Sequence, residues 1–108
     1  HPFSLCAMEN KSNYYFAWHL LDEMLKEYTH RYGKVHGAAV HKDALFYGAR
    51  FIPEGKNTKH PQCFGEHDDC RTDEFYPIKA YRKFYGKTKM SMARYNKNRK
   101  VPKWIYFA

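Results

Sequence analysis

The segment Asn13–Tyr32 decides the fold of this chain, and it reads NYYFAWHLLDEMLKEYTHRY. Its apolar side chains recur three or four positions apart, which is the spacing of one face of an α-helix. The residues on this face are Tyr14, Ala17, Trp18, Leu21, Met24, Leu25, Tyr28 and Tyr32. Ser12 or Asn13 fits the N-cap, and Gly33 fits the position after the last turn. The pattern therefore predicts a helix over 13–32.

A second apolar stripe predicts another helix, over about 77–95. Proline favours the first helical position, which places the start near Pro77. Asp73 and Glu74 lie just upstream, where negative charge suits a helix N-terminus. The stripe consists of Ile78, Tyr81, Phe84, Tyr85, Thr88, Met92 and Tyr95, and the helix is expected to end before Asn96, Asn98 and Pro102.

The residues between these helices are punctuated by glycine and proline, which predicts a long ordered loop with a short helix over Val40–Tyr47. The apolar tail Val101–Phe107 is expected to pack back on the core. The fold prediction is therefore all-α, with two main helices, an ordered loop between them and a packed C-terminal tail. A chain of 108 residues suits a single small domain, which we place at 1–108.

Charge is distributed unevenly along the chain. Residues 1–70 contain 8 Lys and Arg against 9 Asp and Glu, whereas residues 71–108 contain 11 Lys and Arg against 2 acidic residues. Such an excess in one third of a chain favours a polyanionic partner, although a solvated basic face is the alternative. The candidate nucleic-acid-binding residues are Arg31, Lys34, Arg82, Lys83, Lys87, Arg94, Lys97, Arg99, Lys100 and Lys103.

Two H-x-x-C units stand close together in the sequence HPQCFGEHDDC at 60–70. The four side chains His60, Cys63, His67 and Cys70 are of the types that bind Zn²⁺ in structural sites. The spacing lacks the distant second pair that zinc sites usually have, so an incidental loop is the favoured interpretation. We expect no cofactor, with one structural zinc as the alternative.

No catalytic residue is assigned from the sequence. His30 and His36 flank the end of the first helix, but no nucleophile or acid is paired with them by position. Arg31 and Lys34 also suit the negative end of the helix dipole, which is the structural alternative for these two cations. Whether the chain is an enzyme stays open at this point.

Several segments together resemble a family of small uncharacterised proteins of tailed phages, of the marine and cyanophage type. They are His1-Pro2, Asn13-Tyr14, Trp18, Glu27–His36 (EYTHRYGKVH), Ala80–Tyr85 (AYRKFY) and Val101–Trp104 (VPKW). The resemblance spans nearly the whole chain, and EYTHRYGKVH is its most specific part. It implies a further N-terminal segment before His1, so the chain is expected to be the C-terminal part of a longer protein.

A weaker similarity connects this layout with the phage pyrimidine-dimer DNA glycosylases, which are all-α proteins with a basic, aromatic C-terminal end. Their nucleophilic N-terminal amine and first-helix Glu have no matching position here. The similarity implies a role on DNA, in agreement with the charge distribution.

The function expected from the sequence is therefore DNA binding, mainly through phosphates, by a phage protein related to DNA repair or modification. One alternative is a DNA glycosylase or lyase that lacks its catalytic N-terminal end. Another is a small virion or host-interaction structural protein. No run of apolar residues is long enough for a membrane span, so no membrane partner is expected. The expected location is intracellular, in the host cytoplasm during infection.

Overall fold

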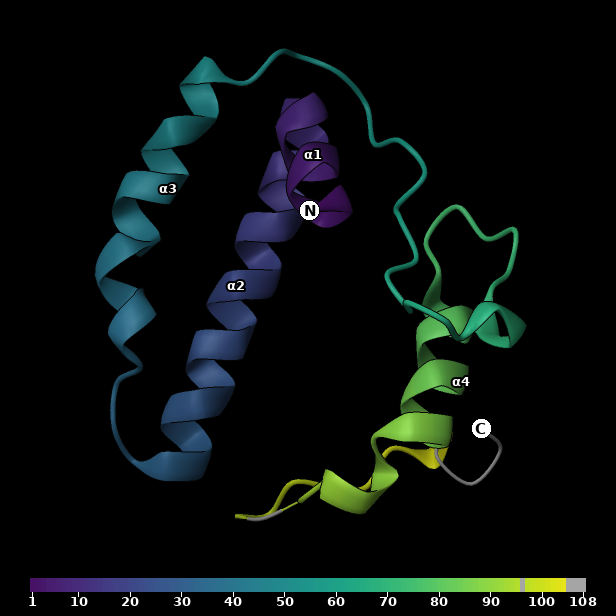
Figure 1. Ribbon diagram of the computed structural model, residues 1–108. Coiled ribbons are helices and arrows are strands. Elements are labelled where there is room, and N and C mark those ends of the chain that lie inside the picture. Colours follow the sequence, from purple (N-terminus) through teal and green to yellow (C-terminus); the bar gives the residue numbers. More distant parts are fainter. Residues whose placement is uncertain (96, 105–108) are drawn as a thin grey trace. The chain divides into compact units, whose positions relative to one another are not determined.

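The computed structural model describes residues 1–95 and 97–104, and this part of the chain contains helices and no strand (Figure 1). The all-α prediction is confirmed. The chain divides into two compact units, unit 1 at His1–Thr58 and unit 2 at Lys59–Ala108. None of the described helices is both long and apolar enough to cross a membrane.

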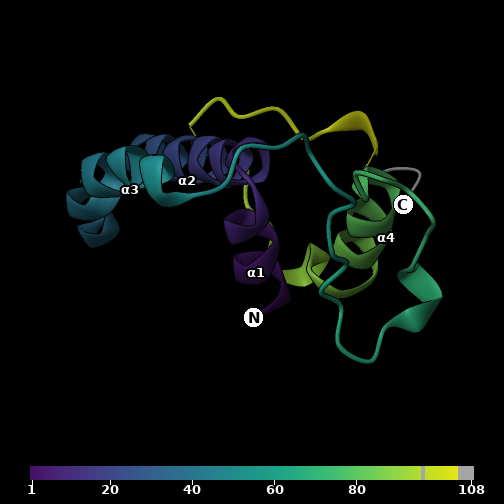
Figure 2. The ribbon, with the colours of Figure 1, turned by 90° about the horizontal axis from the view of Figure 1, so that it is seen from above.

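Unit 1 is an antiparallel helical hairpin with a short helix at its start. The helices are α1 (Pro2–Glu9), α2 (Lys11–Tyr32) and α3 (Lys42–Gly48), and 3₁₀ turns at Gly37–His41 and Ala49–Phe51 flank α3. The chain reverses after α2, so that α3 runs back beside it (Figure 1). The short α1 runs at a clear angle to α2 (Figure 2). The predicted short helix at Val40–Tyr47 thus corresponds to α3.

The start of α2 differs from the prediction, whereas its end agrees with it. The side-chain oxygen of Asn10 accepts the backbone N–H of Asn13 at 2.9 Å, so Asn10 is the N-cap and the helix begins at Lys11. The assignment of the N-cap to Ser12 or Asn13 was wrong. Gly33 follows the helix with φ of 68°, and its N–H bonds the Thr29 carbonyl at 2.8 Å, the ending that glycine favours.

The side chain of Asn13 is instead buried and joins three parts of unit 1. Its amide nitrogen donates to the Cys6 carbonyl at 2.9 Å and to the Thr58 hydroxyl at 2.7 Å. Its oxygen accepts the Thr58 N–H at 3.1 Å. Because each polar atom of this buried amide has a partner, Asn13 fixes α1 and the end of unit 1 against α2.

The hairpin of unit 1 is closed by aromatic side chains from α2. The ring of Trp18 packs edge-on against Phe46 with centroids 5.0 Å apart. The indole Nε1–H of Trp18 donates to the Lys42 carbonyl at 3.0 Å, and the Tyr14 hydroxyl donates to the Leu45 carbonyl. The predicted stripe is therefore the face of α2 that meets α3 at Tyr14 and Trp18. The prediction was wrong for Met24, which is 62% exposed and lies off this face.

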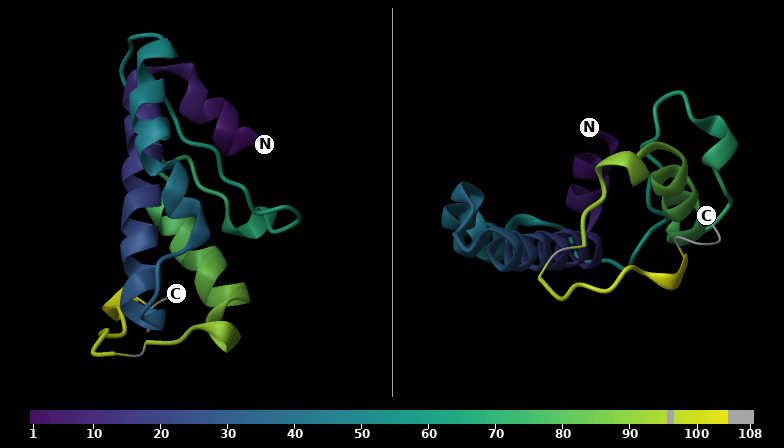
Figure 3. Two further views of the ribbon diagram at one scale, coloured as in Figure 1. Left: turned by 90° about the vertical axis from the view of Figure 1, so that its left-hand side faces the viewer. Right: turned by 90° about the horizontal axis from the view of Figure 1, so that it is seen from below.

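Unit 2 consists of α4 (Ile78–Thr88) and the loop 59–77, which folds back beside it (Figure 3). Its core contains the buried residues Phe64, Cys70 and Ala80, with Phe84 packed against them. The Phe64 and Phe84 rings are stacked with centroids 4.9 Å apart. Short 3₁₀ turns at Asp68–Cys70 and Met90–Met92 lie before and after the helix. The loop thus contributes Phe64 and Cys70 to this core, and α4 contributes Ala80 and Phe84.

The C-terminal end of α4 comes earlier than the prediction of 77–95, which was wrong by seven residues. The hydroxyl of Thr88 donates to the Phe84 carbonyl at 2.7 Å, and the Lys89 N–H closes the last turn on the Tyr85 carbonyl. Thr is a weak helix former, and its bond to the carbonyl four residues back competes with the helical backbone. Apolar residues therefore keep a helical spacing beyond Thr88, although the helix itself has ended.

The C-terminal tail is described as far as Trp104. The Trp104 ring packs edge-on against Tyr85 with centroids 5.9 Å apart, so this part of the tail contacts α4 as expected. The rest of the predicted tail, at 105–107, lies outside the described residues.

The N-terminus of α4 is held by the carboxylate of Glu74. One oxygen accepts the Lys79 N–H at 2.9 Å and the other accepts the Ala80 N–H at 3.0 Å. The hydroxyl of Thr72 also donates to this carboxylate. The Thr72 hydrogen bond and the two backbone N–H groups lower the pKa of Glu74 below its ordinary value. The ionised carboxylate therefore stabilises the folded helix start.

We expect Glu74→Ala to lower the melting temperature at about pH 7, and this loss to disappear at about pH 2. A lowered folded-state pKa contributes stability above the ordinary carboxyl pKa, and that stability is lost as the pH falls through the folded value. Thermal melts of both proteins across this range measure the effect. The exposed neighbour Asp73 provides the control, because Asp73→Asn should leave the melts unchanged. A constant difference between Glu74→Ala and wild type at all pH values would contradict the capping role.

Candidate functional site

The excess positive charge of the chain belongs to unit 2. Residues 1–58 contain 7 Lys and Arg against 6 Asp and Glu, whereas residues 59–108 contain 12 against 5. Unit 1 is therefore close to neutral at +1 and unit 2 carries +7. The charge asymmetry seen in the sequence thus separates two compact units of the structure.

Two of the predicted binding cations tie α4 to the preceding turn. The Lys83 ammonium donates to the Asp69 carbonyl at 2.7 Å, and the Lys87 ammonium pairs with the Asp69 carboxylate. The hydrogen bond from Lys87 lowers the pKa of Asp69. Both lysines remain exposed, but part of their charge is already matched within unit 2.

Other cations of unit 2 face solvent. In the described part of the chain, no ion pair joins the side chain of Lys100 or Lys103 to a carboxylate, and both are exposed. Lys79 is also exposed, but its charge acts on the Glu74 carboxylate and helps to lower the pKa of that group. The Arg82 guanidinium lies over the Trp104 ring, 5.5 Å from its centroid. This contact joins Arg82 of α4 to the tail segment that also carries Lys103.

A tight turn lies within the basic segment 97–100. Lys97 and Asn98 have φ of 53° and 67°, a pair of left-handed residues like that in the centre of a type I′ turn. Asn adopts the left-handed conformation more readily than most residues, whereas Lys has no such preference. The Arg94 guanidinium donates to the carbonyls of Ser91 and Ala93, at 3.3 and 2.9 Å. The side chains of 97–100 are all exposed.

The remaining two predicted binding residues lie in unit 1. Arg31, in the last turn of α2, pairs with Glu27 through its Nε at 2.7 Å. Lys34 is exposed in the segment after the helix. Their position at the end of α2 fits the structural interpretation, in which cations stabilise the negative end of the helix dipole. The candidate surface is therefore built from the eight predicted residues of unit 2.

The four proposed zinc ligands have separate environments. The His60 ring is buried against Tyr76 and the His67 ring packs on Phe84, with centroids 5.0 and 5.3 Å apart. Cys70 is fully buried in the core of unit 2, and the backbone N–H of Cys63 donates to the Tyr81 hydroxyl at 3.0 Å. Among the described residues, no group of three or more His, Cys, Asp and Glu is arranged to hold a metal ion. The structure does not bring these four residues together as a zinc site, because their side chains serve packing instead.

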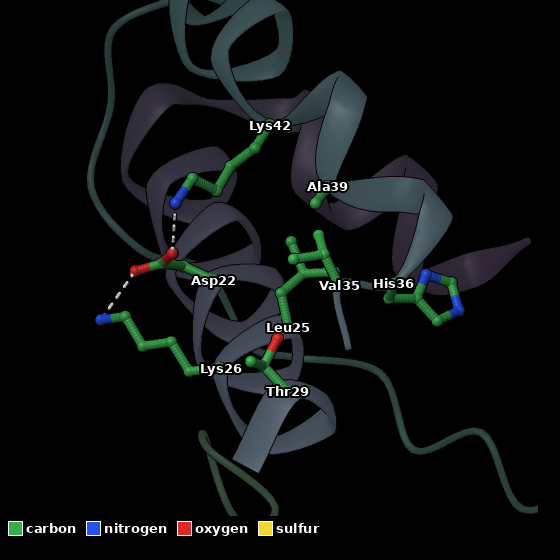
Figure 4. Close-up of a pocket in the computed structure, with 8 residues that line it drawn as sticks. All are labelled: Asp22, Leu25, Lys26, Thr29, Val35, His36, Ala39 and Lys42. Atoms are coloured by element: carbon green, nitrogen blue, oxygen red, sulfur yellow. Dashed lines mark hydrogen bonds and ion pairs between the residues drawn. The ribbon is translucent and has the colours of Figure 1, made fainter. Parts of the chain in front are cut away.

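A pocket of about 330 Å³ lies between α2 and α3 in unit 1 (Figure 4). On one side, the Asp22 carboxylate bonds the Lys42 ammonium at 3.0 Å and the Lys26 ammonium at 3.1 Å. Leu25, Val35 and other apolar groups form the middle. Hydrogen bonds from Lys42 and then Lys26 lower the pKa of Asp22. A carboxylate held in this way is a poor general base, so this cluster serves to cross-link the two helices.

The histidines near this pocket are placed as structural groups. The ring of His36 points away from Asp22 (Figure 4) and its Nδ1 accepts the Ala38 N–H at 3.0 Å. The same ring packs edge-on against Tyr28, 4.8 Å away. His36 thus caps the 3₁₀ turn that leads to α3, whereas His30 is exposed near the end of α2.

The structure adds residues to the candidate site that the sequence analysis missed. Lys59 and Arg71 line a cleft in unit 2. The exposed residue Phe75 is joined to this lining through its backbone carbonyl, which accepts the His60 N–H. Lys59 and Arg71 flank the His and Cys cluster at 60–70, and their charges were counted in the sequence without a role. The signal available was their basic type beside aromatic residues, which nucleic-acid sites combine.

Unit 1 carries a different kind of surface. Phe16, Leu20 and Met24 follow one another at four-residue intervals on α2, and 44, 43 and 62% of their surfaces are exposed. Residues four apart share one face of a helix. This apolar face is distinct from the stripe that meets α3.

No protein-family model, curated protein or solved structure matches the chain significantly.

Proposed function

We propose that this chain is a DNA-binding protein that contacts DNA mainly through its phosphates, using the basic surface of unit 2. The observation that carries the proposal is the concentration of +7 net charge in one 50-residue unit, in whose described part the exposed Lys100 and Lys103 form no ion pair with a carboxylate. Lys and Arg that neutralise phosphates release condensed counterions, which is the main source of sequence-independent affinity for nucleic acid.

The details of α4 support this proposal over a merely solubilising face. A solubilising surface usually intersperses both signs of charge. Here three of the five acidic groups of unit 2 are engaged locally: Glu74 caps α4, Asp69 pairs with Lys87, and Asp68 pairs with Arg71. Local contacts within and near 68–74 thus match these three negative charges, and α4 and the tail keep a net positive charge.

A relation to phage DNA repair or modification rests on the sequence resemblance, and it would place the protein with DNA in the infected host cell. The glycosylase alternative requires a nucleophile beside an acid in a cleft, and the residues of this chain supply neither role by position. We therefore propose binding without assigning catalysis.

The test uses paired neutral substitutions in the tail. In Lys100→Gln with Lys103→Gln, we expect the slope of log affinity against log salt to fall by about two units, because two phosphate contacts are lost. The melting temperature should hardly change, since exposed substitutions alter stability by about 0.5 kcal/mol or less. Fluorescence anisotropy with a labelled duplex measures the slope, and circular dichroism measures the melt.

Lys56→Gln is the matched control, because Lys56 is exposed in unit 1. It should leave both affinity and slope unchanged. Because Lys56→Gln removes one charge and the tail variant removes two, a slope change in Lys56→Gln of half that in the tail variant would show a general charge effect and contradict a surface on unit 2. Absence of binding to any duplex or single strand at low salt would end the proposal.

The structural or interaction protein remains a second candidate because of the apolar face of Phe16, Leu20 and Met24. Exposed apolar patches are typical of interaction surfaces. A mass above 13.0 kDa in light scattering, together with a lack of nucleic-acid binding, would favour this candidate.

A further inference from the structure

Unit 2 contains a cleft that the DNA-binding surface above does not use. It has a volume of about 390 Å³ and is lined by Lys59 and Arg71 together with residues 60–62 and Thr72. This volume lies within the range of sites that take small organic ligands. Two of the six lining residues are cations and none is a carboxylate, so the cleft suits an anionic group.

Hydrogen bonds hold the two sides of this cleft together. The Gln62 amide donates to the Thr72 carbonyl at 2.7 Å and accepts the Thr72 N–H at 2.9 Å. Arg71 donates from Nη1 to the Gln62 carbonyl at 2.7 Å and from Nε to Asp68 at 2.7 Å. Two of the five guanidinium N–H donors are used by these bonds in the described part of the chain, and Asp68 matches part of the Arg71 charge. The guanidinium also lies over the Phe64 ring, 5.7 Å from its centroid. The cleft is thus formed in advance, with Arg71 held in place beside it.

One lining residue of the cleft, His60, begins a series of ring contacts. The buried ring of His60 packs on Tyr76, and Tyr76 packs edge-on against Phe75 with centroids 4.9 Å apart. The His60 N–H donates to the Phe75 carbonyl at 3.0 Å, which fixes the backbone of Phe75 next to the cleft. Phe75 keeps 46% of its surface exposed, although it is a large apolar residue.

We infer that this cleft and the Phe75 ring bind one unpaired nucleotide, and that unit 2 therefore prefers single-stranded DNA to a duplex. Lys59 and Arg71 receive the phosphate, and the base stacks on Phe75. Proteins that bind single strands combine a basic groove with aromatic rings in this way. In a duplex the neighbouring bases already cover each base face, so only the phosphate contacts remain. This inference rests on the proposed DNA binding and adds the strand form that the site selects.

The experiment compares an oligothymidylate of about 12 nucleotides with a duplex of the same length by fluorescence anisotropy at about 50 mM salt. The wild-type protein should bind the single strand more tightly. Phe75→Ala should weaken single-strand binding about tenfold and leave duplex binding unchanged, because only the stacked base is lost. Phe75→Trp should keep the preference, since it retains an aromatic face. Phe51→Ala, at an exposed phenylalanine of unit 1, is the matched control and should change neither affinity.

The results for Phe75→Ala test the single-strand preference, and the results for the wild-type protein test DNA binding itself. Unchanged single-strand affinity in Phe75→Ala, or an equal loss for both strand forms that Phe75→Trp does not restore, would overturn the inference while DNA binding stands. Failure of the wild-type protein to bind either probe would overturn DNA binding itself.

Discussion

Between about 50 and 200 mM salt, the affinity of the protein for a DNA duplex should fall about a thousandfold. The basis is the exposed basic set of α4 and the tail, which can contact about six phosphates at once. Each phosphate contact contributes about 0.9 to the slope of log affinity against log salt, so six contacts give this loss over a fourfold change in salt. A titration of a labelled duplex at several salt concentrations measures the slope directly.

The titration uses the full chain, which contains both the nearly neutral unit 1 and the basic unit 2. The control is a charge-neutral ligand probe, free thymidine, whose weak association should not respond to salt in this way. A slope near zero would mean that the +7 charge of unit 2 is only a solvated face. A steep slope that survives Lys100→Gln with Lys103→Gln would place the contacts elsewhere on the chain.

The sequence predicts α2 well because two independent signals agree there. The helical spacing of Trp18 and its neighbours marks the face that meets α3, and Gly33 marks the end with the left-handed backbone that glycine permits. The start was misplaced because Ser12 and Asn13 are also good N-caps. Only the tertiary contacts of Asn13 with Cys6 and Thr58 explain why Asn10 takes that position.

The helices that the sequence analysis missed or extended lack such agreement. The first helix, α1, has Pro2 at its first turn but no marked apolar stripe, so periodicity gave no signal. The extension of α4 to residue 95 followed apolar spacing alone. The Thr88 hydrogen bond that accompanies the end of the helix is a local competition that spacing does not register.

For the candidate site, the sequence shows which residues are basic, but it does not show which of them form ion pairs. The basic excess of the C-terminal third appears in the sequence, but the engagement of Lys83 and Lys87 by Asp69 depends on the turn at Asp68–Cys70. The loop conformation also decides the role of the His and Cys residues at 60–70. Cys70 belongs to the core, and that assignment depends on how the loop folds onto α4.

We expect Trp18→Ala to destabilise unit 1 by about 3 kcal/mol, at the lower end of the range for such substitutions because the indole is only half-buried. The change removes the ring contact with Phe46 and the hydrogen bond to the Lys42 carbonyl, which together join α2 to α3. A unit of 58 residues has a total stability of roughly 3–9 kcal/mol at the usual value per residue. Trp18→Ala should therefore remove between about a third and all of the stability of unit 1, as measured by urea unfolding followed by circular dichroism.

Two further variants separate the contributions of Trp18. Trp18→Phe keeps an aromatic ring and loses the indole N–H, so it should cost about 1 kcal/mol, the net value of one hydrogen bond. Met24→Ala, on the exposed face of the same helix, should cost about 0.5 kcal/mol or less. An equal cost for Trp18→Ala and Met24→Ala would contradict the hairpin, because a stripe that packs against α3 must lose more than a face that meets solvent. If Trp18→Phe is as damaging as Trp18→Ala, the hydrogen bond to Lys42, rather than the ring, holds α3 on α2.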